Sequence, residues 1–147
     1  MPIETIPYKE TGYFSKLICD YLAEDESITP FYHRFPNIEA FRDQIEEKKK
    51  GYDDSFRKTL VSALKKQLEG LSLSEATQAN LEALHSEKTL TITTGHQLNL
   101  FTGPLYFLYK IISVINLSEA LKKAYPDHDF VPVYWMATED HDFEEIN

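Results

Sequence analysis

The sequence predicts an α/β fold in which a helical N-terminal segment precedes a strand, a long helix and a second strand. Residues 1–88 carry apolar side chains at helical spacing, punctuated by capping residues and glycines. From residue 89 the pattern changes to two short β-branched and aromatic runs, separated by one long apolar helix. Such an order is typical of a parallel βαβ unit. We therefore divide the chain into a helical segment, 1–88, and a βαβ segment, 89–147.

The first helix is expected over residues 12–24. Tyrosine, phenylalanine, leucine and isoleucine recur there three and four residues apart, which favours an amphipathic helix. Cys19 lies within this apolar pattern, so we expect a buried structural thiol. The next stretch, "DESITPFYHRFPN", contains two prolines and predicts a connection that is packed by its aromatic rings.

Three more helices are expected before residue 88, and each begins at a capping residue. The expected caps are Asn37, then Asp53 or Asp54, and finally Ser72, which has Glu75 at capping-box spacing. Gly51 and Gly70 mark the ends of the first two of these helices.

The βαβ segment begins with "TLTITT" (89–94) and ends with "FVPVYWMAT" (130–138). Pro132 cannot donate a ladder hydrogen bond, so it should lie near the start of its strand or on a sheet edge. The helix between the strands is expected over 105–121, with Pro104 in its first turn and Thr102 or Gly103 as its cap. It is apolar around most of its circumference, which predicts a helix covered on both sides.

Two polar segments follow the two strands, "GHQLNLFTG" and "EDHDFEE". The carboxyl ends of neighbouring parallel strands share one sheet edge, where open α/β folds bind ligands. We therefore expect the polar residues of the two segments to face each other. They are His96, Gln97, Asn99 and Thr102 after the first strand, and Glu139, Asp140, His141 and Asp142 after the second.

These residue types suit an acid–base, nucleotide or amino-acid site. A histidine is partly charged near neutral pH, so His96 could donate to a phosphate or to a leaving group. Glu139 or Asp140 could hold a substrate ammonium or deprotonate an attacking amine, and their charge would favour an imidazolium at His141. The helix start at 103–105 would attract an anion. Simpler interpretations also stay open: Gly95 only permits a turn, and the acidic run is a solvated helix start.

Composition narrows the class of protein. A net charge of −9 argues against a nucleic-acid partner or an anionic membrane surface. One cysteine excludes an internal disulfide, and histidine spacings typical of metal sites are lacking, so no metal is predicted. The nine-residue loop lacks G-x-G-x-x-G, which disfavours a dinucleotide site. The N-terminus has no basic region followed by an apolar run, and we expect a cytoplasmic protein that acts on small molecules.

"TTGHQLNLFTGPLYFLYKIISVINLSEAL" and "FVPVYWMATEDHDFEEIN" together resemble the bacillithiol biosynthesis cysteine-adding enzymes, closely over residues 90–147. The resemblance implies a Rossmann-like core related to the nucleotidyltransferase superfamily. It also implies a helical coiled coil through which the full-length protein forms a homo-oligomer. The implied activity is a ligase that adds cysteine to the amino group of glucosaminyl malate. Family members are several times longer, so the 147-residue chain is expected to be an inactive fragment.

By position, the resemblance implies substrate-binding residues and catalytic residues. The substrate-binding set is Thr94, Gly95, Gln97, Asn99, Gly103, Pro104, Tyr106 and Asp142, and the catalytic set is His96, Glu139, Asp140 and His141. At position 96 the family more commonly has glutamine. The run from Thr93 to His96 nevertheless fits the [HT]-x-G-H signature of nucleotidyltransferases. Amide formation from a free carboxylate needs activation, which makes ATP a chemical possibility by analogy, through an adenylate or an acyl phosphate, while the residues leave the cofactor open.

Two other functions remain open at this point. One is a non-catalytic association module, because two strands alone leave both sheet edges unpaired. The other is a nucleotide- or metal-dependent nucleotidyltransferase or hydrolase.

Overall fold

The computed structural model describes residues 4–97, 99 and 103–138. The chain divides into two compact units, residues 1–43 and 44–147, and the boundary falls inside helix α3 (Phe41–Lys50). Each unit is described by itself. The proposed boundary at residue 88 stays a prediction.

The first unit begins with two short helices, of which the second lies within the range 12–24 where one helix was expected. Helix α1 (Tyr8–Thr11) ends at Gly12, whose φ of +71° is the left-handed conformation that favours glycine. Helix α2 (Lys16–Leu22) begins after Ser15, whose hydroxyl accepts a hydrogen bond from the Ile18 N–H. The helix predicted over 12–24 is therefore confirmed over 16–22, and its predicted start was four residues too early because Ser15 is the N-cap.

The connection after α2 is partly regular. Residues Glu26–Phe31 form a 3₁₀ helix, η1, capped by the Asp25 carboxylate. The Tyr21 ring packs against Tyr32 and Phe35 at centroid distances of 5.3 and 5.2 Å, which confirms the predicted aromatic packing. Cys19 is half-buried, so the prediction of a buried thiol was wrong.

Helices α3, α4 (Ser55–Gln67) and α5 (Glu75–Ala83) follow. The Asn37 side chain accepts from the Ala40 N–H in the turn that leads into α3, and Asp53 accepts from the Ser55 N–H. Helix α5 is capped by Ser74 instead of the expected Ser72. The Ser74 hydroxyl accepts a hydrogen bond from the Thr77 N–H.

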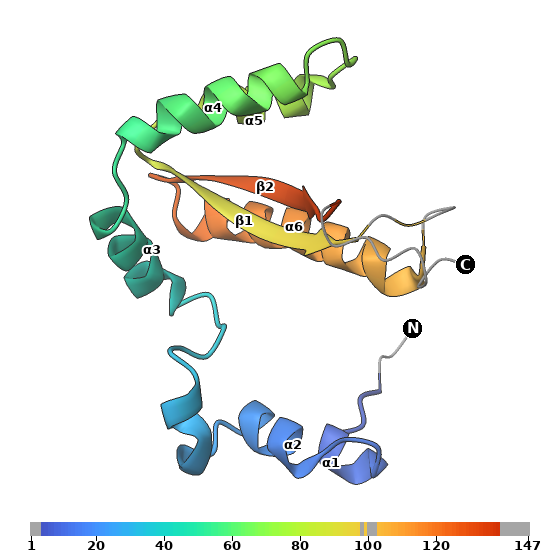
Figure 1. Cartoon of the computed structure of the whole chain (residues 1–147). Coiled ribbons are helices and arrows are strands. Elements are labelled where there is room, and N and C mark those ends of the chain that lie inside the picture. The colour runs from blue at the N-terminus through green and yellow to red at the C-terminus, as the bar shows by residue number, and fades with distance from the viewer. Residues whose placement is uncertain (1–3, 98, 100–102, 139–147) are drawn as a thin grey trace. The chain divides into compact units, whose positions relative to one another are not determined.

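Strands β1 (Thr89–His96) and β2 (Asp129–Met136) are paired in parallel, from Thr89 opposite Asp129 to His96 opposite Met136. Helix α6 (Leu105–Ala124) connects them. The predicted βαβ unit is therefore confirmed, as Figure 1 shows. Pro104 is the N-cap of α6 and lies just outside its first turn.

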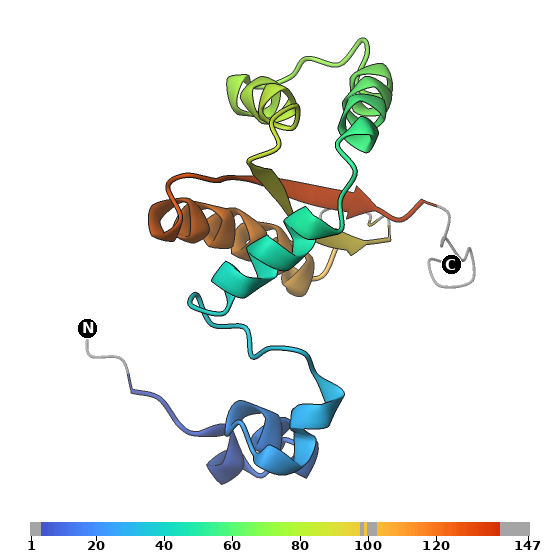
Figure 2. The ribbon, with the colours of Figure 1, turned by 90° about the vertical axis from the view of Figure 1, so that its left-hand side faces the viewer.

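The helices of the second unit lie on both faces of this sheet (Figures 1 and 2). On one face, Val61 of α4, Leu84 after α5 and Val131 of β2 form a buried cluster. On the other, α6 packs along both strands. Its outward side stays uncovered by the described residues, with Tyr109 and Ile112 at least half exposed. The expectation of a helix covered on both sides was thus wrong for this part of the chain.

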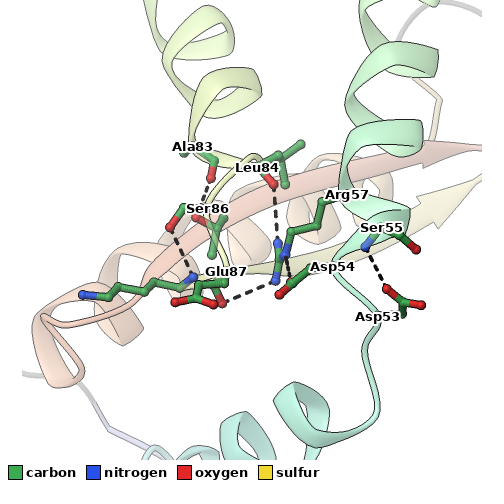
Figure 3. Close-up of polar contacts among 10 residues, drawn as sticks. Asp53, Asp54, Ser55, Arg57, Ala83, Leu84, Ser86 and Glu87 are labelled. Carbon is green, nitrogen blue, oxygen red and sulfur yellow. Dashed lines mark hydrogen bonds and ion pairs between the residues drawn. The ribbon is translucent and has the colours of Figure 1, made fainter.

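Arg57 of α4 joins the start of that helix to the chain that leaves α5 (Figure 3). Its guanidinium donates to the Leu84 and Glu87 carbonyl oxygens, each 3.4 Å away, and pairs with Asp54 at 3.0 Å. It also lies over the Tyr52 ring, 4.9 Å from the centroid. The Arg57 side chain is 13% exposed. Its contacts satisfy carbonyl groups at and after the end of α5, where no backbone N–H of the helix is available to donate.

Arg57→Gln should lower the free energy of unfolding by about 1–3 kcal/mol, because the charge-assisted hydrogen bonds to both carbonyls are lost. The matched control is Lys58→Gln at the exposed neighbouring position, which should change stability by less than about 0.5 kcal/mol. Urea unfolding measures both. Equal effects of the two substitutions would show that the Arg57 contacts do not stabilise the unit.

Candidate functional site

The candidate site lies where both strands end. The Ala137 N–H donates to the His96 carbonyl oxygen at 3.1 Å, immediately beyond the last register pair. The chain therefore leaves β1 and β2 at the same edge of the sheet. This confirms the adjacency on which the predicted site depends.

His96 is the centre of the described contacts. Its Nε2 lies 2.5 Å from the Tyr106 hydroxyl oxygen, at the start of α6. Its Nδ1 lies 3.1 Å from both the Gln97 carbonyl oxygen and the Asn99 amide nitrogen. The Asn99 amide also donates to the Gln97 carbonyl at 3.0 Å. The ring packs edge-on against Phe107 at 6.1 Å.

The two tautomers of His96 use these partners differently. With the proton on Nε2, His96 donates to the Tyr106 oxygen and accepts from Asn99, so the Tyr106 O–H is free to donate to a ligand. With the proton on Nδ1, His96 donates to the Gln97 carbonyl and accepts from the Tyr106 hydroxyl. In both cases His96 and Tyr106 form a pair that can exchange a proton.

Two glycines shape the backbone around this pair. Gly103 has φ +61°, and a Cβ there would lie 2.5 Å from Cγ of Asn99, the side chain that contacts His96. Gly95 lies within β1, where a Cβ would be 2.8 Å from the Trp135 carbonyl oxygen of β2. The interpretation of Gly95 as a turn glycine was wrong, because its role is close approach between the strands.

Tyr134 supports the histidine from β2. Its hydroxyl donates to the His96 carbonyl oxygen at 3.2 Å, and its ring meets Phe107 edge-on at 5.5 Å. Burial raises the pKa of Tyr134 above its usual value, so the hydroxyl stays neutral and remains a donor near pH 7.

Lys110 of α6 was not among the predicted site residues. Its ammonium donates to the Gly95 carbonyl oxygen at 3.1 Å and lies 5.6 Å from the Tyr106 ring centroid. A usable signal was present, since residues four apart share a helix face and Lys110 follows Tyr106 by four.

The structure brings four predicted residues into mutual contact: His96, Gln97, Asn99 and Tyr106. Thr94 lies in β1 opposite Tyr134, while Gly103 and Pro104 precede α6. The remaining predicted residues lie outside the described part of the chain: Thr102, Glu139, Asp140, His141 and Asp142. That these residues lie close to His96 stays a prediction.

Two searches of the described residues were negative. No group of three or more His, Cys, Asp or Glu side chains that could hold a metal ion occurs among residues 4–97, 99 and 103–138. Within the same part of the chain, no helix combines the length and apolarity needed to cross a membrane.

Comparison with known proteins identifies the family. Residues 1–147 match the family model described as bacillithiol biosynthesis BshC, N-terminal Rossmann-like domain. The chain belongs to the BshC family. The resemblance noted from residues 90–147 is confirmed, and so is the Rossmann-like fold class.

Curated BshC relatives match the whole chain. A protein from Christiangramia forsetii named "Putative cysteine ligase BshC" is 62% identical over 100% of the chain and 27% of its own length. Relatives of the same name from Flavobacterium psychrophilum and Bacillus cereus are 60% and 33% identical, also over 100% of the chain. The chain thus spans about a quarter of the length of these BshC proteins, 28% and 26% in the latter two.

Proposed function

We propose that this chain is the N-terminal part of a ligase that joins cysteine to the amino group of glucosaminyl malate in bacillithiol biosynthesis. Membership of the BshC family and the names of its relatives support the reaction class. The observation that carries the site is the contact between His96 and Tyr106 at the carboxyl edge of the parallel strands. A cytoplasmic location and a homo-oligomeric full-length protein are part of this proposal.

Amide formation requires an amine to lose a proton when it attacks an activated carboxyl carbon. The His96–Tyr106 pair would hold that proton, with His96 as acceptor and Tyr106 as relay. Acceptance through Tyr106 requires the His96 proton on Nδ1, so the Gln97 carbonyl would fix the imidazole orientation by accepting from Nδ1 and from the Asn99 amide, and Gly103 would leave room for Asn99. Glu139, Asp140 and His141 would complete the site by holding the ammonium form of the amine.

The carboxyl group must be activated, and ATP would supply that activation when bound. The donors in the described part of the site suit a phosphate, since α6 begins beside His96 and Lys110 carries a positive charge. A carboxylate fits the same donors, so the described residues support an anionic ligand without selecting the phosphate. The chemistry assigned to His96 and Tyr106 is the same for either ligand.

The complete product of the gene should convert cysteine and glucosaminyl malate to bacillithiol, measured by mass spectrometry. Tyr106→Phe should lower kcat by roughly 10²-fold, because the hydroxyl that contacts His96 is removed. Tyr109→Phe is the matched control on the exposed side of the same helix, and it should retain full activity. Equal activity of the two variants would remove Tyr106 from the mechanism.

Position 96 needs two variants of its own within this experiment. His96→Gln can keep a hydrogen bond to Tyr106 but cannot carry a proton, whereas His96→Ala loses both. A proton-holding role requires both variants to be slow. Full activity in His96→Gln would show that the side chain only positions Tyr106.

A further inference from the structure

The first half of α6 carries a single charged residue, Lys110, among mostly apolar side chains. The sequence from Leu105 runs LYFLYKIISVINLSE, so Lys110 precedes the next charged residue, Glu119, by more than two helical turns. No oppositely charged residue lies within one turn of Lys110 on this helix, so its ammonium forms no ion pair along the helix. Its neighbours therefore decide what it does.

Lys110 connects the two elements that carry the candidate site. Its Nζ lies 3.1 Å from the Gly95 carbonyl oxygen, one residue before His96. The same ammonium lies 5.6 Å from the ring of Tyr106, whose hydroxyl contacts His96. An ammonium has three N–H donors, and the Gly95 carbonyl takes one. Among the described residues no carboxylate pairs with the other donors.

The side groups that surround His96 in the described chain are mostly donors. Lys110 offers N–H groups and a full positive charge, and Tyr106 offers its hydroxyl when His96 carries its proton on Nε2. A positive charge beside neutral donors attracts an anionic oxygen, and hydrogen bonds from charged donors are stronger than neutral ones. Both substrates of the proposed reaction carry carboxylates, and its expected activator carries phosphates.

We infer that Lys110 binds an anionic oxygen of a substrate, carboxylate or phosphate, and holds it beside the His96–Tyr106 pair. This inference rests on the proposed function and adds a charged binding residue to it. The competing role is structural. Successive strand carbonyls point in opposite directions, and the His96 carbonyl faces β2, so the Gly95 carbonyl faces the open edge of β1. In that role Lys110 only satisfies the Gly95 carbonyl at the unpaired edge of β1.

The experiment titrates the complete gene product with L-malate, L-cysteine and inorganic phosphate in separate calorimetric runs. Lys110→Met should raise the dissociation constant for the bound anion about 10-fold. Lys110→Arg, which keeps the charge, should have a dissociation constant within about 3-fold of the wild-type value. Lys123→Met, an exposed lysine in the last turn of α6, is the matched control and should bind like wild type. Loss in the malate or cysteine run assigns a carboxylate, and loss in the phosphate run assigns a phosphate.

Thermal unfolding without ligand separates the two roles. If Lys110→Met lowers the melting temperature but leaves every dissociation constant unchanged, the anion-binding role is overturned. Failure of the wild-type protein to bind any of the three anions overturns it as well. The proposed function is tested separately by product formation. Lys110-dependent anion binding without bacillithiol synthesis would retain this inference and reject the ligase.

Discussion

Leu121→Ala is expected to lower the free energy of unfolding by about 2–5 kcal/mol. Leu121 is 0% exposed in α6, the helix that packs along both strands. Removing its branched end leaves a cavity that the rigid neighbouring strands can only partly fill, so both transfer energy and packing contacts are lost. Urea unfolding gives the change directly.

Leu105→Ala is the control for Leu121→Ala. It removes the same atoms from the same helix, but Leu105 is 63% exposed and its loss should cost less than about 1 kcal/mol. If the two variants unfold at the same urea concentration, the packing of α6 on the sheet is not as described.

Gly95→Ala is expected to destabilise the protein by about 1–3 kcal/mol and, in the complete gene product, to reduce the proposed ligase activity at least about 10-fold. The added Cβ would lie 2.8 Å from the Trp135 carbonyl oxygen and 3.0 Å from the Trp135 Cβ. A backbone oxygen cannot rotate away, so β1 and β2 must separate at the end that carries His96. The shift would misplace the imidazole relative to Tyr106.

Thr93→Ala is the control for Gly95→Ala, because residue 93 is an exposed position on the same face of β1. It should leave activity unchanged and cost less than about 1 kcal/mol. Activity of Gly95→Ala equal to that of Thr93→Ala would mean that close approach of the strands does not support the site. Urea unfolding and product formation are the two measurements.

The parallel strand pair was predictable because its signals are local. The β-branched run at 89–94, the proline before the helix and the apolar length of 105–121 define a strand–helix–strand order, and the crossover then requires parallel pairing. The site edge follows from that topology. The same reasoning placed His96 at that edge, and the family resemblance implied Tyr106, but their direct contact comes only from the structure.

Other features could not be read from periodicity. A helical repeat does not fix where a helix begins, so the cap of α5 was assigned to Ser72 when Ser74 provides it. The helix expected from residue 12 begins only at Lys16, because Gly12 ends α1 and Ser15 caps α2 although the apolar pattern starts earlier. The contact of Lys110 with Gly95 depends on how α6 lies on β1, which no local pattern specifies.

The pairing of Thr89 with Asp129 has a consequence for biosynthesis on the ribosome. The two strands are separated by the whole of α6, so β1 is made first and has no strand partner until β2 emerges. Contacts of such long sequence separation form slowly, and unpaired strand edges are prone to aggregate. During translation, α4 and α5 are made before β1 and α6 is made before β2, so nascent β1 can pack against these helices before its strand partner arrives.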